Sequence, residues 1–229
     1  MGRRFGASTQ SQYILKKSEE KMKIAIIGSG NLGLSIAKGL VYNNTYTSLY
    51  LTKRDLSTIE KWEEYNNVKT TSDNQEAVKN ADILIFTVQP RQFDGILEEI
   101  KGALTNKHVL ISAITGYSIS RMEEKLGSNY PVIRSMPNTA ISVGKSMTCL
   151  CCNIAGEKRI AIAEAIFNGL GTTIKIAEKQ MQAATVVCAS GHCVPDEHTK
   201  EADQCAAAVE SSAAEPARRW THTALPRCI

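Results

Sequence analysis

Short apolar runs alternate with amphipathic segments from residue 22 to about residue 176, a pattern typical of stacked β–α units. The apolar runs predict strands at 23–28, 48–52, 68–70, 83–88, 108–112, 131–135, 146–152 and 172–176. Helical patterns occupy residues 31–42, 56–65, 73–79, 90–101, 118–126, 156–168 and those from 178 onward. The run at 83–88 is apolar on both faces, as in a central strand covered by helices on both sides. The sequence therefore predicts an α/β fold, a Rossmann-like doubly wound parallel sheet over residues 22–177.

This regular pattern stops at Gly191. Residues 192–229 contain only four Val, Leu or Ile side chains and no glycine, but three of the six prolines of the chain. Such a segment cannot bury enough apolar surface to offset the entropy lost on ordering it. We interpret residues 192–229 as an irregular tail, either disordered or read out of frame, and whether it is biological stays open. The helical segment at 178–191 would then expose an apolar face that normally packs against further helices.

The first 21 residues are basic and lack the apolar core of a secretory signal. We expect residues 1–21 to be a disordered extension ahead of a natural start at Met22. They carry much of the net charge of +4, so the body is nearly neutral and nucleic-acid binding has no support. No apolar run reaches the roughly 18 residues of a transmembrane helix, so we expect no membrane partner.

The seven cysteines are odd in number and irregularly spaced. Without an export signal, this favours reduced thiols and a cytoplasmic location. Cys149, Cys151 and Cys152 lie in an apolar strand, where neighbours point to opposite faces and are poorly placed to share a metal ion. The histidines and the cysteine between residues 192 and 198 lack a second ligand pair at a suitable spacing, so we expect no metal site.

The stretch IAIIGSGNLG ends the first predicted strand, begins the first predicted helix, and has the GxGxxG spacing of a dinucleotide-binding turn. Gly28 allows the tight turn, Gly30 lets a pyrophosphate approach the backbone, and Gly33 lets the helix pack closely on the strand. The free N–H groups of Asn31 and Leu32 would then face the anion. Because a second strand follows about 20 residues later, we predict dinucleotide binding; a glycine-rich turn without a ligand is the alternative.

The end of the second predicted strand indicates which dinucleotide binds. NAD enzymes keep an acidic residue there for the ribose hydroxyls, whereas this chain has Thr52, Lys53 and Arg54. A hydroxyl and two cations would neutralise a 2′-phosphate, so NADP(H) is favoured, with NAD(H) and a merely solvated loop as alternatives. Asp55 could bind the ribose, but we interpret it as the N-cap of the helix at 56–65.

Three further motifs accompany the glycine-rich turn. They are Val88-Gln89-Pro90 after the fourth strand, Ser112-Ala113-Ile114-Thr115-Gly116 after the fifth and Met136-Pro137-Asn138-Thr139-Ala140 after the sixth. With these motifs, residues 22–191 resemble the pyrroline-5-carboxylate reductases, which have VKP, an SxxAG-like turn and MPNTP at these places. Gln89, Thr115 and Ala140 depart from that pattern, but none removes a charge that the reaction needs.

The resemblance implies a set of cofactor contacts. On the pyrophosphate side these are Ile27, Gly28, Ser29, Gly30, Asn31 and Leu32, with Gly33 in the same turn. At the adenosine ribose they are Thr52, Lys53 and Arg54, and on the adenine side the contact is Asn74. On the nicotinamide side they are Thr87, Val88, Gln89, Pro90, Ala113, Ile114 and Thr115. Asn138 is predicted to face the cofactor because its turn lies beside a strand end in the crevice. Two of these residues have plainer explanations: Asn74 lies in a helix start with a capping box between Ser72 and Gln75, and Asn138 lies in a turn.

The resemblance also implies the reaction, which is hydride transfer from NADPH to the cyclic imine of 1-pyrroline-5-carboxylate, giving L-proline in proline biosynthesis. Because a protonated imine is already electrophilic, we expect few catalytic side chains and assign none. In the family, a helical domain entered through a TxxSGSGPA-like motif holds the substrate carboxylate and forms the dimer. Ser190 and Gly191 match the start of that motif and are predicted on the substrate side, so 178–191 would be the first helix of a truncated dimerisation domain.

Because the family pattern is lost after Gly191, we expect this chain to bind NADPH but to be impaired in proline synthesis. The homo-oligomer interface of the family would be largely missing. Two alternatives stay open, namely another NADP-dependent dehydrogenase with the same first domain and a non-catalytic NADP(H)-binding module.

Overall fold

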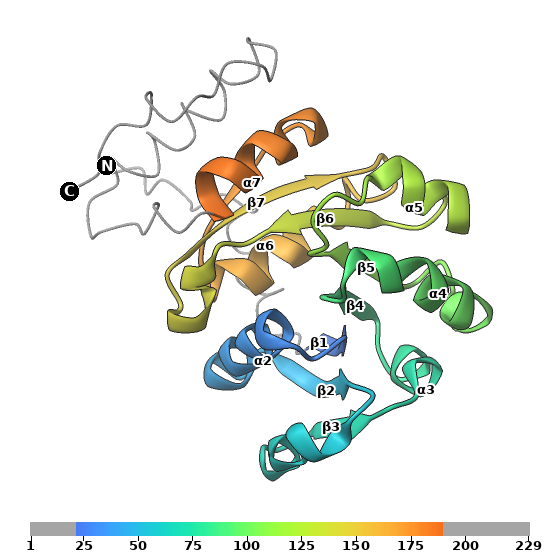
Figure 1. The fold of residues 1–229 in the computed structure, drawn as a ribbon, viewed down its shortest axis with the longest axis vertical. Coiled ribbons are helices and arrows are strands. Elements are labelled where there is room, and N and C mark those ends of the chain that lie inside the picture. The colour runs from blue at the N-terminus through green and yellow to red at the C-terminus, as the bar shows by residue number, and fades with distance from the viewer. Residues whose placement is uncertain (1–21, 190–229) are drawn as a thin grey trace, which may run out of the picture.

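The computed structural model describes residues 22–189, and one eight-stranded sheet runs through them (Figure 1). Its strands are β1 (Met22–Ile27), β2 (Tyr46–Thr52), β3 (Val68–Thr71), β4 (Ile83–Phe86), β5 (Val109–Ser112), β6 (Val132–Met136), β7 (Ser146–Cys152) and β8 (Gly171–Lys175). Every strand that the pattern predicts is present, and the Rossmann-like fold is confirmed. The expectations for residues 1–21 and 190–229 lie outside the described residues.

The strand order is β3-β2-β1-β4-β5-β6-β7-β8, and the first six strands are parallel. The prediction of a wholly parallel sheet is wrong at β7, which pairs antiparallel with β6. The segment between Met136 and Ser146 contains only the 3-10 turn η4 (Thr139–Val143), which ends at Gly144 with a left-handed φ of 72°. A parallel connection needs a crossover of about a dozen residues or more, so this shorter segment reverses the chain. β8 is parallel to β7.

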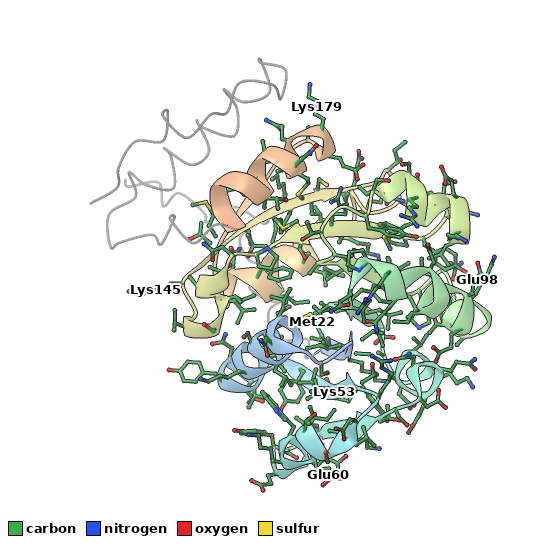
Figure 2. All side chains as sticks on the ribbon, viewed as in Figure 1. Met22, Lys53, Glu60, Glu98, Lys145 and Lys179 are labelled. Carbon is green, nitrogen blue, oxygen red and sulfur yellow. The ribbon has the colours of Figure 1, made fainter. Side chains whose placement is uncertain are left out.

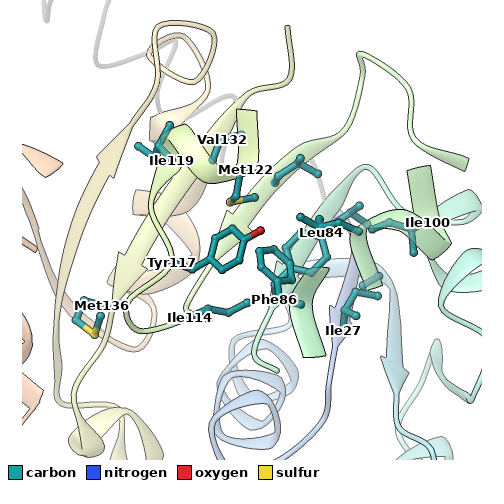
Figure 3. Packing of buried hydrophobic residues seen from close by; sticks show 14 of the residues in the cluster. Ile27, Leu84, Phe86, Ile100, Ile114, Tyr117, Ile119, Met122, Val132 and Met136 are labelled. Carbon is teal, nitrogen blue, oxygen red and sulfur yellow. The ribbon is translucent and has the colours of Figure 1, made fainter. Parts of the chain in front are cut away.

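Helices cover both faces of the sheet (Figure 1). They are α2 (Asn31–Asn43), α3 (Asn74–Lys79), α4 (Pro90–Ile100), α5 (Ile119–Leu126), α6 (Ile160–Asn168) and α7 (Met181–Ala189). Side chains of α2 and α6 share one buried cluster with Ile24 and Ile26 of β1. Side chains of α3, α4, α5 and α7 share the other with Leu84 and Phe86 of β4, where Tyr117 lies close to Phe86 and Met122 (Figure 3). The sheet therefore has a core on each side, as a doubly wound fold requires.

Two details predicted for the helices differ from the structure. The helix expected at 56–65 is a pair of 3-10 turns, η1 (Leu56–Thr58) and η2 (Glu60–Glu64). The Ile59 amide donates to the Leu56 carbonyl at 2.8 Å, while the Thr58 hydroxyl occupies the Asp55 carbonyl at 3.1 Å, which favours the tighter i→i+3 pattern. Asp55 caps η1 as predicted, since its carboxylate accepts from the Ser57 amide.

The cap of α3 is also not the predicted one. The residue whose side chain caps this helix is Asp73, which accepts from the backbone amides of Gln75 and Glu76, so the capping box expected from Ser72 is wrong. An aspartate with two such bonds satisfies two of the free N–H groups at the helix start by itself. Ser72 is left exposed one residue earlier.

Candidate functional site

A cavity of about 650 Å³ opens at the carboxyl ends of β1, β2 and β4. This is the point where strand order reverses, since β1 lies between β2 and β4, and ligands of open α/β sheets bind at such points. Lys53 lies just beyond the end of β2 (Figure 2). The cavity is lined by Ile27, Gly28, Ser29, Gly30, Thr52, Lys53, Arg54, Ser72, Asn74, Thr87, Val88, Gln89, Gln92, Gly95, Ile96 and Glu99.

The three glycines of the turn after β1 have three different environments. Gly28 has a φ of 94°, and a Cβ there would overlap the Val88 side chain. A Cβ on Gly33 would come within 2.7 Å of the Thr87 hydroxyl and 2.9 Å of the Gly28 carbonyl. A Cβ on Gly30 would meet no described atom within 4 Å, and Gly30 lines the cavity. Gly28 and Gly33 are thus required by packing, whereas the absence of a side chain at Gly30 keeps cavity space open to a ligand.

The start of α2 provides hydrogen-bond donors at the same place. Gly30 is its N-cap and, among the described residues, no side chain caps the helix. The Ser29 side chain is fully buried, and its Oγ finds no hydrogen-bond partner within the part of the chain that the structure describes. Uncapped N–H groups at a helix start attract anions, and a buried hydroxyl normally has a partner. Both features fit a phosphate group in the turn.

Hydrogen bonds hold the turn against the neighbouring strands. The Gly28 amide donates to Thr52 Oγ1 at 3.2 Å, and the Ser29 amide donates to the Thr52 carbonyl at 2.8 Å. Thr87 Oγ1 donates to the Gly28 carbonyl at 2.7 Å. Thr52 and Thr87 therefore support the backbone of the turn, and their roles are structural as well as cavity-lining.

Two cations border the cavity next to β2. Lys53 is half-buried and Arg54 is exposed, and both line the cavity. The Asp55 carboxylate turns to its own loop, where the Ser57 hydroxyl donates to it at 2.7 Å. Hydrogen bonds from the Ser57 side chain and amide, with a smaller contribution from the Lys53 charge, lower the pKa of Asp55. Asp55 is thus committed to its cap and leaves Lys53 and Arg54 to face an anionic ligand.

The outer wall of the cavity includes residues that the sequence did not point to. Asn74, which was predicted, faces α4, and α4 adds Gln92, Gly95, Ile96 and Glu99. Only Gly95 could have indicated from the sequence that α4 lines a site. A glycine in a helix interior lowers helix stability by about 1 kcal/mol relative to alanine, so its presence there suggests a role other than helix formation.

The other predicted residues lie outside the cavity lining. Gly33 packs beneath the turn, and Pro90 occupies the first turn of α4. Ile114 is 2% exposed in the core and Asn138 is 3% exposed, with its Oδ1 accepting from the Ala140 amide. The full set is Asn31, Leu32, Gly33, Pro90, Ala113, Ile114, Thr115 and Asn138. Those that follow β5 and β6 lie farther along the same carboxyl edge, so their contact with a nicotinamide stays a prediction.

Three expectations concern what else the chain holds. Ser190 and Gly191 fall outside the described residues. Within residues 22–189, no three His, Cys, Asp or Glu side chains gather as metal ligands. Over the same span, no helix has the length and apolar character that crossing a membrane requires.

Comparison with known proteins agrees with the motifs. Residues 23–116 match the family model described as NADP oxidoreductase coenzyme F420-dependent. Pyrroline-5-carboxylate reductase 1 of Dictyostelium discoideum is 40% identical over 184 residues, which is 73% of this chain and 33% of that protein. Pyrroline-5-carboxylate reductase 2 of the same organism is 38% identical over 185 residues, 73% of this chain and 62% of its own length. The chain thus spans less than two thirds of either relative.

Solved structures give the same result. The pyrroline carboxylate reductase of Plasmodium falciparum with NADP bound has a TM-score of 0.65 at 28% identity, covering 74% of this chain and 63% of that one. The pyrroline-5-carboxylate reductase of Coxiella burnetii has a TM-score of 0.70 at 27% identity, covering 85% of this chain and 78% of that one. The resemblance of this chain to the pyrroline-5-carboxylate reductase family is therefore confirmed.

Proposed function

We propose that this domain binds NADP(H) at the cavity after β1, β2 and β4, and that it serves the reduction of 1-pyrroline-5-carboxylate to L-proline. The observation that carries the proposal is the turn itself. Gly30 leaves open space beside the cavity, the start of α2 lacks a side-chain cap, and Ser29 Oγ is buried without a described partner. A pyrophosphate would satisfy these groups together.

The two cations after β2 support the choice of NADP(H) over NAD(H). Lys53 and Arg54 border the cavity on its adenosine side, while Asp55 is held in its own cap. A 2′-phosphate placed beside Lys53 and Arg54 gains charge-assisted hydrogen bonds that a ribose hydroxyl does not offer to the same extent. The NADP-bound relative from Plasmodium falciparum supports the same choice.

Bound NADPH supplies the hydride that reduces the imine carbon, while the imine nitrogen keeps its proton and becomes the amine of proline. The work of this chain is then to bind and orient. The turn after β1 fixes the phosphates, and Val88 and Gln89 line the cavity at the end of β4, where they would limit movement of the nicotinamide end. The residues expected to hold the substrate carboxylate begin at Ser190, outside the described residues.

Fluorescence titrations with NADPH and NADH test the cofactor assignment. The wild-type protein should prefer NADPH, and Lys53→Met should reduce that preference at least about tenfold, because a charge-assisted bond contributes about 1.5–3 kcal/mol. Lys158→Met removes the same charge from an exposed turn that does not line the cavity, and it should keep the preference. A folded wild-type protein that binds neither nucleotide would contradict the proposal.

Addition of pyrroline-5-carboxylate to the NADPH-saturated protein tests the chemistry. The sequence-based expectation is binding without sustained turnover, because the family pattern for the carboxylate site is lost after Gly191. Steady oxidation of NADPH with formation of proline would refute that expectation and would support reductase activity in the chain itself. Binding without oxidation would favour a non-catalytic NADP(H)-binding role.

We also infer a cytoplasmic location and a small-molecule substrate. Cys151 and Cys152 form no disulfide within residues 22–189, which supports a reducing compartment. Homo-oligomer formation, as expected for the family, is a further proposal that light scattering of the purified chain would test.

A further inference from the structure

A second cavity, of about 190 Å³, opens near the amino ends of β1 and β2, and we call it the amino-edge cavity. None of its lining residues lines the cavity proposed for NADP(H). Ser48 and Thr52 border the two cavities from the same strand, β2, and lie about 13 Å apart, since a strand rises about 3.3 Å per residue. The amino-edge cavity is therefore a separate feature. It is lined by Lys23, Ser48, Tyr50, Asn67, Lys69 and Asn80.

Strand register brings these side chains to one face of the sheet. Lys23 of β1 pairs with Ser48 of β2, and Tyr50 of β2 pairs with Lys69 of β3. Because Ser48 and Tyr50 are two residues apart on one strand, both pairs point to the same face. Tyr50 is 5% exposed and packs in the buried cluster that contains side chains of α3. Lys23 and Lys69 thus flank β2 on the face that α3 covers.

α3 is too short to cover this face along its whole length. Its six residues span about 9 Å at 1.5 Å per residue, whereas the seven residues of β2 span about 23 Å. The buried residues of α3, Ala77 and Val78, pack in the same cluster as Tyr50. Asn80, which follows the helix, borders the amino-edge cavity. The short helix therefore leaves the amino end of the face open around the Tyr50 ring.

The amino-edge cavity has two positive side chains in its lining and no negative one. Neither Lys23 nor Lys69 forms a salt bridge with any residue in the described span 22–189. The Lys69 ammonium lies 5.7 Å from the Tyr50 ring centroid, within the range of a cation–π contact. A cleft lined by charges of one sign concentrates its field and attracts the opposite charge. The cavity is therefore suited to an anion.

The acidic side chain that contacts β3 in this region, Glu63, is engaged elsewhere. Its Oε1 accepts from the Thr70 amide at 2.9 Å and from the Thr70 hydroxyl at 2.8 Å. Thr70 directly follows Lys69 on β3, and neighbouring side chains of a strand point to opposite faces of the sheet. Glu63 is thus held by a side chain of the other face and does not neutralise the amino-edge cavity.

The charge and the size of the cavity indicate a class of ligand. Two ammonium groups match a phosphate, which carries a charge of about −1.5 to −2 near neutral pH, better than a carboxylate with a single charge. The Ser48 hydroxyl and the Asn67 amide add neutral donors. A volume of about 190 Å³ is below the roughly 300–1,000 Å³ of sites for drug-sized molecules, so it suits a smaller ligand than a nucleotide.

We propose that the amino-edge cavity binds a phosphate dianion through Lys23 and Lys69, either as inorganic phosphate or as a small phosphate monoester. The proposal is independent of NADP(H) binding, because the two cavities share no residue.

Backbone amide NMR of the whole chain tests the proposal, with sodium phosphate and glycerol 1-phosphate titrated separately at constant ionic strength. The amides of residues 48–50 and 67–69 should show saturable shifts with a dissociation constant of about 1 mM or lower. Sodium acetate at the same concentrations should not produce them. Tighter binding of the ester assigns the cavity to phosphate monoesters, and equal or weaker binding assigns it to inorganic phosphate; either result supports the dianion site. Phosphate bound in the turn after β1 would be reported separately by residues 28–32.

Variants show which side chains bind the anion. Lys23→Met and Lys69→Met should each weaken phosphate binding at least about threefold, because each removes one of the two charges in the lining. Lys61→Met removes an exposed charge from η2, outside the lining, and should keep the wild-type affinity. Thermal unfolding shows whether each variant is folded.

Three results would overturn the phosphate site. They are the absence of saturable shifts at residues 48–50 and 67–69 in the folded wild-type protein, equal shifts with acetate, and a loss of affinity in Lys61→Met as large as in Lys23→Met and Lys69→Met.

Discussion

The turn after β1 and the segment after β5 lie at the same edge of the sheet, but the turn lines the cavity whereas the segment packs into the core. In the turn after β1, residues 28–33, Gly30 is exposed and opens on the cavity, and the start of α2 has no side-chain cap among the described residues. In the segment after β5, residues 113–118, Ile114 and Tyr117 are buried in the core.

In the segment after β5, the polar end of the Tyr117 side chain has its partner within the protein. The Tyr117 hydroxyl donates to Asp94 at 2.5 Å, the Arg121 guanidinium lies 4.4 Å from the Tyr117 ring centroid, and the ring packs edge-on against Phe93. Figure 3 shows Ile114 and Tyr117 within the same packed cluster. A position at the carboxyl edge of the sheet therefore does not by itself make a ligand site. The turn after β1 has no side-chain cap at the start of α2 and a Ser29 hydroxyl without a described partner, so it is the one that can bind a ligand.

The largest effect on stability is expected for Gly28→Ala, because a side chain at this position strains the backbone of the turn. A left-handed φ of 94° and an overlap with Val88 should together lower the free energy of unfolding by about 3 kcal/mol or more. Urea unfolding measures this. Gly30→Ala is the matched variant, since its φ of −83° suits alanine.

Gly30→Ala should change the free energy of unfolding by no more than about 1 kcal/mol but weaken NADPH binding more than tenfold, because its methyl group enters the phosphate space. Equal losses of stability in both variants, or unchanged NADPH binding by Gly30→Ala, would contradict the contrast between the two glycines.

The next largest effect on stability is expected at the ion pair between Arg134 and Glu178, which lies beside the segment after β5. Arg134 of β6 is 7% exposed, and its Nη1 donates at 2.8 Å to Glu178, which also accepts from the Ile119 amide at 2.7 Å. Glu178→Gln leaves the buried guanidinium without a charged partner and should lower the free energy of unfolding by about 2 kcal/mol, less than for a fully buried pair because Glu178 is partly exposed.

A surface ion pair is the control for this substitution. Glu164 pairs with Lys175 at 3.0 Å, and both are more exposed to water than Arg134. Glu164→Gln should cost less than about 1 kcal/mol. Chemical denaturation of both variants decides the point, and a Glu178→Gln effect no larger than that of Glu164→Gln would show that the segment is not anchored as described.

The pH dependence of stability gives a smaller effect in the same region. Burial, followed by the hydrogen bond to Asp94, raises the pKa of Tyr117 to about 12 from the usual 10.0. A raised pKa means that this stabilisation is fully present below pH 10 and is lost as the pH rises towards 12.

Tyr117→Phe should cost about 1 kcal/mol near neutral pH through the lost hydrogen bond and should lose less stability than the wild type between neutral and strongly alkaline pH. Denaturation curves of both proteins at several pH values measure the difference. Parallel alkaline losses in the two proteins would argue against a buried, protonated Tyr117.

The smallest effect is expected at Gly95. Alanine there restores an interior helix position with no clash, so Gly95→Ala should raise the free energy of unfolding by up to about 1 kcal/mol. The same methyl group borders the cavity and should weaken NADPH binding several-fold. Thermal unfolding and nucleotide titration give the two values, and stabilisation without any loss of affinity would remove Gly95 from the site.

Much of the fold could be predicted because periodicity reports burial. Runs such as 83–88 are apolar on both faces only when helices cover both, and the strand positions follow directly. The reversal at β7 could not be seen in this way, since an apolar run has no direction, and the short connection from Met136 to Ser146 was the available clue. The turns at 56–64 depend on individual hydrogen bonds, which periodicity does not report.

The candidate site was predictable where backbone conformation dictates the residue. The backbone conformation at Gly28 and the open space at Gly30 favour glycine, so both positions can be recognised in the sequence. The cavity position of Lys53 could be predicted from its place at a strand end. The α4 wall could not be predicted, because Gln92, Ile96 and Glu99 are ordinary helix residues that reach the cavity only through packing of α4 beside α3. Whether Ile114 and Asn138 contribute backbone atoms to a nicotinamide site stays a prediction.

We propose that the turn after β1, rather than the segment after β5, holds the phosphates of a dinucleotide. Backbone amide NMR of the whole chain during titration with NADPH tests it most directly. The amides of residues 28–32 should show the largest saturable shifts, and those of residues 113–118 smaller ones. Unchanged amide shifts at residues 28–32 in a folded sample, or shifts centred on residues 113–118 instead, would contradict this phosphate site.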